Sequence, residues 1–192
     1  MRLFVAVNPP THLVGDLTRR LDTPRRELLL AWTRPESWHL TLAFLGEWPV
    51  ERVPALTDGL IDAAAGVGPF TLRLGPLGAF PHLRRPRVLV LHADGGHPLH
   101  ELAGRVRRAV DAAWPDGPQD RKDFRPHLTL ARIRSLLAAP DLARLQALDL
   151  GEFEPFGVAE ACLVSSALRR EGARYEVLAR LPLDGRGRAG EN

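Results

Sequence analysis

Two histidines in this sequence stand in the same tetrapeptide, His-Leu-Thr-Leu, which occurs at residues 39–42 and again at residues 127–130. Both copies lie in stretches whose residues favour a β-strand. Because side chains alternate between the two faces of a strand, each His and the Thr two residues later point to one face, and the leucines point to the other. Two such strands would bring two imidazoles and two hydroxyls to one surface.

This set of groups suits chemistry on a phosphodiester. An imidazole titrates near neutral pH, so one His can accept a proton from water while the other donates a proton to the departing oxygen. Thr41 and Thr129 can donate hydroxyl hydrogen bonds to the non-bridging phosphate oxygens. Packing alone gives no reason for such a His/Thr pair to occur twice. We therefore expect His39 and His127 to be catalytic and both threonines to bind substrate.

The elements that would position the two tetrapeptides follow a repeated plan. Residues 2–21 and 87–106 match at a constant offset of 85 residues. Each segment begins with an apolar, β-prone run, breaks at Pro or Gly, and continues with a helical spacing of leucines and valines. The sequence therefore predicts an α+β protein of two pseudo-symmetric lobes, each a small, mainly antiparallel sheet with outer helices, around a central V-shaped cleft.

Individual elements are predicted from hydrophobic period and turn residues. Strands are expected at residues 3–7, 38–45, 70–74, 87–92, 124–133, 157–167 and 174–181, with a loop at 75–86. Helices are expected at residues 11–30, 51–65, 97–114 and 141–147. Residues 1–183 should form a single bilobal domain, and the Gly/Arg-rich residues 184–192 a loose tail.

Further side chains are candidates for substrate contact. Strict alternation from His127 puts Arg132 on the leucine face, so it reaches the cleft only if the strand ends or twists there. The same parity predicts that Phe44 is a core residue. Tyr175 and Phe80 could stack on a nucleobase, although the sequence favours a structural role for each. A positive rim that steers RNA, or an ordinary charged loop, is predicted for Arg84, Arg85, Arg87, Arg169, Arg170 and Arg174.

Composition narrows the class of protein. The 26 basic and 23 acidic residues give a net charge of only +3, which is a weak argument for any partner. The single cysteine, Cys162, cannot form an internal disulfide and fits a reducing compartment. No apolar run approaches the roughly 20 residues that cross a bilayer, and the apolar residues 1–7 are shorter than a signal sequence. These features predict a soluble, cytoplasmic protein without membrane contact.

Cofactor chemistry finds little support in the sequence. His92, His97 and His100 have the spacing of no familiar metal site. There is no Gly-rich phosphate loop, and Lys122, the only lysine, lacks the surroundings of the nucleophile that an ATP-dependent ligase needs. We expect neither a metal nor another cofactor.

The paired motifs resemble those of the 2H phosphoesterase superfamily, which is named for its two H-x-T-x motifs. Within it the chain is similar to the RNA 2′,3′-cyclic phosphodiesterases, long called 2′-5′ RNA ligases. The similarity rests on RLFVAV at the start, WHLTLAFLG, FPHLRRPRVLVL, FRPHLTLAR and a closing pattern of Ser166, Gly172 and Tyr175. It covers nearly the whole chain.

What this resemblance implies is metal-independent opening, by water, of RNA or nucleotide 2′,3′-cyclic phosphate ends to 2′-phosphates. His39 would be the proton donor to the leaving 3′ oxygen and His127 the proton acceptor, although the residues alone leave this order open. The resemblance also implies that Arg132 meets the phosphate or the base. The expected partner is an RNA or oligonucleotide with a cyclic phosphate end, and the protein is expected to be a monomer.

Two alternatives remain open from the sequence. The first is reversible, ATP-independent joining of RNA ends through a 2′-5′ bond, which microscopic reversibility permits at the same site. The second is a non-catalytic module that binds RNA ends. The natural RNA substrate is not indicated by the residues.

Overall fold

The structure is a computed structural model that describes residues 1–118, 122–169 and 172–186. Its strands are β1 (Arg2–Val7), β2 (Ala31–Trp32), β3 (Leu40–Glu47), β4 (Phe70–Phe80), β5 (Val88–Asp94), β6 (His127–Arg132), β7 (Phe156–Val158), β8 (Glu160–Arg169) and β9 (Gly172–Pro182). Its α-helices are α1 (Thr11–Arg20), α2 (Asp22–Glu27), α3 (Val53–Ala65), α4 (Gly96–Ala113) and α5 (Ala139–Ala147), and its 3-10 helices are η1 (Pro35–Ser37) and η2 (Val50–Arg52).

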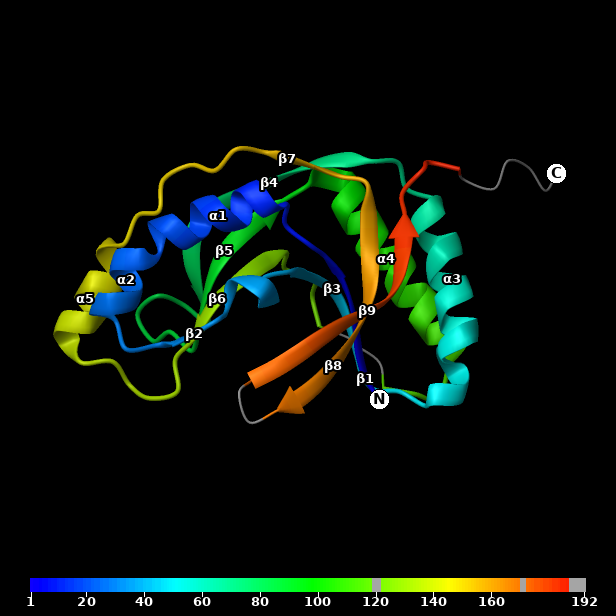
Figure 1. The fold of residues 1–192 in the computed structure, drawn as a ribbon, viewed down its shortest axis with the longest axis horizontal. Coiled ribbons are helices and arrows are strands. Elements are labelled where there is room, and N and C mark those ends of the chain that lie inside the picture. Colours follow the sequence, from blue (N-terminus) through cyan, green and yellow to red (C-terminus); the bar gives the residue numbers. More distant parts are fainter. Residues whose placement is uncertain (119–121, 170–171, 187–192) are drawn as a thin grey trace.

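These strands form one sheet in the order β7-β4-β5-β6-β3-β1-β8-β9, with β2 paired to β6, and every pairing is antiparallel. The sheet is strongly curled into a half-barrel (Figure 1). Only Ala159 separates β7, at one edge of the sheet, from β8, which pairs with β1 near the other edge. So short a connection requires the two ends of the sheet to approach each other.

Helices cover one face of the sheet and enclose the hydrophobic core. On β1 the odd-numbered Leu3, Val5 and Val7 point into this core. The core is completed by leucines and a valine of α1, α3 and α4, among them Leu13, Leu17, Leu56, Leu60, Leu99, Leu102 and Val106. Phe4 and Ala6 alternate with the core residues of β1 and lie on the opposite face, in a small cluster with Cys162 and Val164. We call this opposite face the histidine face.

The sheet register relates the first strands of the two repeated segments. Ala6 of β1 lies opposite Thr41 of β3, and Val90 of β5 lies opposite Thr129 of β6. The first strands of the two halves therefore correspond at an offset of 84 residues, from Ala6 to Val90, and not at the predicted 85. The matching order of strand, helix and antiparallel strand is what the repeated sequence pattern predicted.

The prediction of a separate sheet for each lobe is wrong. Leu40 of β3 pairs with Leu128 of β6, and this pair joins the strands of both halves into a single sheet. The helices also cross between the halves. Helix α4, which follows β5, packs against β3 and against α3 of the first half. The coarser prediction of an α+β fold built on antiparallel pairing is confirmed, as a single half-barrel.

Some element boundaries differ from the predicted ones for local reasons. The helix expected at residues 11–30 is two helices, because Pro24 has no N–H and its ring would clash with the carbonyl of Arg20, four residues earlier. Strand β4 continues beyond residue 74 to Phe80, since a register shift between Leu74 and Leu77 accommodates Gly75 and Pro76 without ending the pairing with β5. The predicted loop at 75–86 is correspondingly shorter.

None of the helices in the described part of the chain is both long and apolar enough to cross a membrane. The predicted tail falls mostly on residues 187–192, which lie outside the described residues.

Candidate active site

The two tetrapeptide strands meet at the centre of the sheet. Leu40 and Leu128 form the single bridge between β3 and β6. The histidines precede these leucines by one residue in each strand, so His39 and His127 are diagonal neighbours across the bridge. Diagonal positions in an antiparallel pair lie roughly 7–8 Å apart. Both imidazoles point to the histidine face, and this spacing lets them flank one phosphate group.

Each histidine also has a threonine as its cross-strand neighbour. When the antiparallel register of the bridge is continued by one residue on each side, His39 falls opposite Thr129 and Thr41 falls opposite His127. Residues at opposite positions project to the same face of a sheet. By this extended register, the four polar side chains that alternation predicted for one surface would form two mixed His/Thr pairs, each with one member from each half.

Main-chain carbonyls hold both imidazoles in the same way. Nδ1 of His39 lies 2.8 Å from the carbonyl oxygen of Ser37, and Nδ1 of His127 lies 2.6 Å from the carbonyl oxygen of Arg125. A carbonyl oxygen can only accept a hydrogen bond, so Nδ1 carries the hydrogen in each ring. The second nitrogen, Nε2, is left to gain or lose a proton.

Aromatic rings support the two imidazoles. Phe4 stacks on His39 with ring centroids 4.7 Å apart, and Tyr175 meets His39 edge-on at 5.4 Å. Phe80 meets His127 edge-on at 4.9 Å and also contacts the ring of His92 at 6.2 Å. Both predicted aromatic candidates, Tyr175 and Phe80, therefore lie at the site, one beside each histidine.

Burial lowers the pKa of both histidines below the ordinary value. For His39 the opposing influence is its hydrogen bond to Ser37, which favours the charged ring, and the proximity of His127 lowers the pKa further. The pKa of His127 is also lowered chiefly by burial, against the hydrogen bond to Arg125. The positive charges of His92 and Arg132 add to this lowering at His127. Both imidazoles are therefore held by a main-chain carbonyl, but only His127 has an arginine among the charges that lower its pKa.

Matching bulges change the faces of two residues that follow the tetrapeptides. The register of β1 with β3 shifts so that Leu42 is skipped, and the register of β5 with β6 skips Leu130. The added residue reverses the alternation beyond it. Phe44, predicted to be in the core, is instead 58% exposed, and its ring centroid lies 6.3 Å from that of Phe4.

The same reversal brings Arg132 to the histidine face. Strict alternation placed it among the leucines, but Leu130 and Ala131 both lie in the core, and Arg132 is exposed beside His127. Phe44 and Arg132 stand five residues after His39 and His127, and so occupy equivalent positions. One half of the sheet thus presents an aromatic ring where the other presents a cation.

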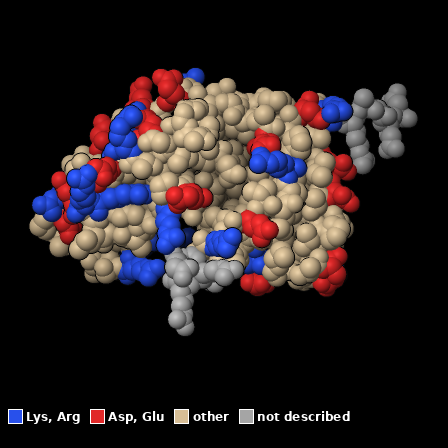
Figure 2. All heavy atoms as spheres, viewed as in Figure 1, with Lys and Arg blue, Asp and Glu red and all other residues tan. Residues whose placement is uncertain are grey.

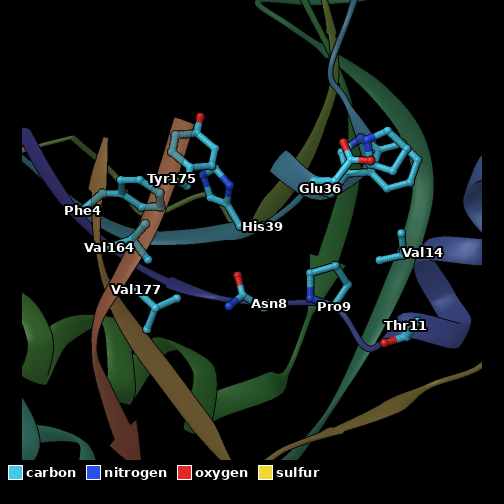
Figure 3. A pocket seen from close by; sticks show the side chains of 12 residues that line it. Phe4, Asn8, Pro9, Thr11, Val14, Glu36, His39, Val164, Tyr175 and Val177 are labelled. Carbon is cyan, nitrogen blue, oxygen red and sulfur yellow. The ribbon is translucent and has the colours of Figure 1, made fainter. Parts of the chain in front are cut away.

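A pocket of about 350 Å³ opens beside His39. Figure 3 shows Phe4, His39 and Tyr175 on one side of this pocket and Glu36 on the other. Trp38 completes the aromatic part of the lining, and prolines and valines supply most of the rest. We call this cavity the His39 pocket. The second imidazole, His127, is not among the described residues that line it.

The predicted positive rim is only partly visible. Arg84, Arg85 and Arg87 are exposed in the loop between β4 and β5, and Arg174 is exposed on β9. The side chains of Arg169 and Arg170 lie outside the described residues. Figure 2 shows acidic and basic side chains interspersed on this side of the molecule rather than gathered into one basic surface. A steering role for the rim remains a prediction.

Several site residues were not identified from the sequence. Phe4 could have been found, because alternation along β1 places it on the face opposite Leu3 and Val5. His92 is the cross-strand partner of His127 and could be recognised only once the register was known. Glu36 and Ser37 lie in the 3-10 helix η1, for which no periodic pattern exists.

Within the described residues, no group of three or more potential metal ligands is found.

Known proteins provide an independent comparison. Residues 9–170 match the 2′-5′ RNA ligase superfamily. An RNA 2′,3′-cyclic phosphodiesterase of Thermus thermophilus is 34% identical over 192 residues, which cover 96% of this chain and 91% of that protein. Another, from Aquifex aeolicus, is 32% identical over 158 residues, 80% of this chain and 82% of that one.

Solved structures show the same fold. TT0787 of Thermus thermophilus superposes with a TM-score of 0.84 at 30% identity, covering 97% of this chain and 100% of that one. Apo LigT of E. coli gives a TM-score of 0.75 at 27% identity, covering 95% and 97%, and LigT has also been crystallised with 3′-AMP and with phosphate. The match extends over most of the sequence and includes both tetrapeptides, and the chain belongs to the 2′-5′ RNA ligase superfamily.

Proposed function

We propose that this protein hydrolyses RNA or nucleotide 2′,3′-cyclic phosphate ends to 2′-phosphates by acid–base catalysis with His39 and His127. The observation that carries the proposal is the diagonal placement of the two imidazoles across the Leu40–Leu128 bridge, each with Nδ1 bound to a carbonyl and Nε2 available. Relatives that align over most of the chain are named RNA 2′,3′-cyclic phosphodiesterases.

In the proposed reaction, water attacks phosphorus opposite the 3′ oxygen. Nε2 of His127 takes a proton from the water as the new P–O bond forms. The bond from phosphorus to the 3′ oxygen breaks, and Nε2 of His39 gives its proton to that oxygen. The product carries a 2′-phosphate and a 3′-hydroxyl. Solvent then returns the two histidines to their starting states, and neither Nδ1 hydrogen takes part.

The different surroundings of the histidines support this order of roles. The 3′ oxygen belongs to the ribose, and the His39 pocket supplies a cavity for the attached nucleoside next to His39. Arg132 and His92 oppose protonation of His127, as a base that must begin neutral requires. The negative charge of a bound phosphodiester favours the charged form of a nearby imidazole, which would help His39 to carry its proton.

The remaining polar groups receive roles as phosphate ligands. Thr41 and Thr129, each placed across from a histidine, would donate hydrogen bonds to the non-bridging oxygens as negative charge builds there. Arg132, on the same face and beside His127, would pair with the phosphate or with the RNA backbone. Tyr175 and Phe80 would pack against the substrate as well as against the imidazoles.

The experiment is turnover of an RNA oligonucleotide with a 2′,3′-cyclic phosphate end. His39→Ala and His127→Ala should each abolish hydrolysis while circular dichroism and thermal melting remain unchanged, because neither side chain lies in the core. The product should be the 2′-phosphate, identified by its phosphorus NMR signal. Full activity of either variant, or a 3′-phosphate product, would refute the mechanism.

The same assay separates the proposal from the other two interpretations of the sequence. Adding an RNA with a free 5′-hydroxyl end tests for joined product, which would favour ligation over hydrolysis. Binding of the cyclic end without any turnover would instead support a non-catalytic module.

A further inference from the structure

We propose that the His39 pocket is a guanine-selective nucleobase site in which the Glu36 carboxylate recognises the Watson–Crick edge of the base. This inference deepens the proposed function and rests on it, since it names the terminal nucleotide that the same site prefers.

The lining of the pocket suits a flat, uncharged ring system. Three aromatic residues line it, Phe4, Trp38 and Tyr175. Phe4 and Trp38 are buried and Tyr175 is half-buried, so Tyr175 is the ring against which a nucleobase can stack. The volume, about 350 Å³, falls in the range of ordinary small-ligand sites. Among the described residues that line the pocket, none is an arginine or a lysine. The cavity is therefore poorly suited to a phosphate and well suited to a base.

Glu36 is the only carboxylate among those lining residues, and it lies across the pocket from Phe4, His39 and Tyr175 (Figure 3), with an exposed side chain. Its negative charge disfavours a phosphate in the cavity, which directs the phosphate toward Arg132 on the other side of the histidines. Arg25 is near enough for its charge to interact with this carboxylate. An ionised Glu36 can accept hydrogen bonds from a ligand.

An ionised carboxylate accepts hydrogen bonds and donates none. Guanine is the one RNA base with two adjacent donors, N1–H and N2–H, on its Watson–Crick edge, and two carboxylate oxygens can accept both. Adenine and cytosine place a ring acceptor beside their amino group. Uracil has one N–H flanked by two carbonyls, which the carboxylate repels. The charge and geometry of the carboxylate thus distinguish guanine from the other three bases.

One short element connects base recognition to catalysis. Glu36 and Ser37 are neighbours in η1, and the carbonyl of Ser37 holds the imidazole of His39. A base bound by Glu36 is therefore positioned by the same 3-10 helix that orients His39, the proposed acid. Base recognition and orientation of His39 thus depend on adjacent residues of one short element.

The test compares kcat/KM for the four nucleoside 2′,3′-cyclic monophosphates in the unchanged protein and in Glu36→Gln. The guanosine substrate should be preferred by roughly tenfold, the order expected for one bidentate contact to a base. Glu36→Gln should remove this preference by lowering the rate for guanosine relative to the other three substrates, because glutamine offers one acceptor and one donor where guanine needs two acceptors. Glu36→Asp, which keeps the carboxylate, should restore part of it.

Glu51→Gln is the matched control, since Glu51 is an exposed glutamate in the other 3-10 helix, η2, and does not line the pocket. Equal rates for the four substrates, or a guanosine preference that survives in Glu36→Gln, would overturn the inference while leaving the hydrolase proposal intact. If neither a cyclic nucleotide nor the RNA oligonucleotide with a cyclic end is turned over, the hydrolase proposal fails. In that case the inference is tested by binding: calorimetry should show tighter binding of guanosine than of adenosine 2′-monophosphate to the unchanged protein, and no such difference in Glu36→Gln.

Discussion

Leu42 and Leu130 occupy matching bulges, one in each of the strands that carry the two tetrapeptides. Each bulge reverses the alternation of the residues that follow it, so Phe44 and Arg132 reach the histidine face at equivalent positions. The sheet thereby carries an additional aromatic ring on the side of His39 and a cation on the side of His127. We expect this difference to give a substrate one preferred orientation between the two histidines.

Removing the charge of Arg132 should change the pH profile of the enzyme. The Arg132 guanidinium lowers the pKa of His127, so Arg132→Gln should raise that pKa. Because His127 must be neutral to act as the base, the acidic limb of kcat/KM should move to higher pH, and the maximum should fall as a phosphate ligand is lost. The control is Arg144→Gln, since Arg144 pairs with Asp141 within α5. An acidic limb that stays in place would contradict the proposed base.

The threonine hydroxyls should matter for the chemical step. Thr41→Val and Thr129→Val should each lower kcat by roughly 10²–10³-fold, the usual cost of removing one donor to developing negative charge. Thr41→Ser and Thr129→Ser keep the hydroxyl and should retain most activity. Single-turnover rates separate the chemical step from product release. Valine variants that match the unchanged protein would exclude the threonines from phosphate binding.

The bulges can be tested through stability. Leu42→Ala removes a core side chain that is 1% exposed and should lower the free energy of unfolding by about 2–5 kcal/mol. Phe44→Ala, two residues later, removes an exposed ring and should change the free energy of unfolding by no more than about 0.5 kcal/mol. Urea denaturation measures both. A large loss in Phe44→Ala would mean that the alternation continues unbroken through Leu42.

Acid should destabilise the fold through the two histidines. Both have a pKa below the ordinary value of about 6.5, so below that pH the unfolded chain binds more protons than the folded one. Their contribution to stability is present above about pH 6.5 and is lost as the pH falls through the folded-state values. The double variant His39→Gln/His127→Gln should lose less stability between about pH 7.5 and pH 5. Denaturant midpoints at both pH values provide the measurement, and equal losses would contradict the pKa directions.

The histidine face was predictable from the sequence because it depends on short-range alternation. His39 and Thr41 share a parity, and the repeat of that pattern at residue 127 points to a second copy of the same strand. The bulge at Leu42 was not predictable, since an extra residue in one strand is defined only by the partner strand. The run from Leu40 to Leu45 has the pattern of a regular strand, and this is why the sequence placed Phe44 in the core.

Longer-range features depend on how the strands pair. The sequence predicted two lobes from two repeated segments, but it contains no signal that β3 and β6 pair with each other at one position. The His39 pocket is likewise assembled from η1, β1 and β9, which are far apart in the chain. Glu36 could be recognised as a candidate only after folding had placed it opposite Phe4 and Tyr175.

The imidazoles are held by peptide oxygens, and this makes their tautomer independent of any neighbouring side chain. Replacing the side chain at Ser37 or Arg125 leaves the carbonyl in place, so a single substitution there cannot delete the acceptor. Only a change in the course of the main chain can release the rings. Side chains around the two histidines can consequently be changed without removing the carbonyls that hold the rings, which makes this scaffold a practical starting point for redesign of the proposed site.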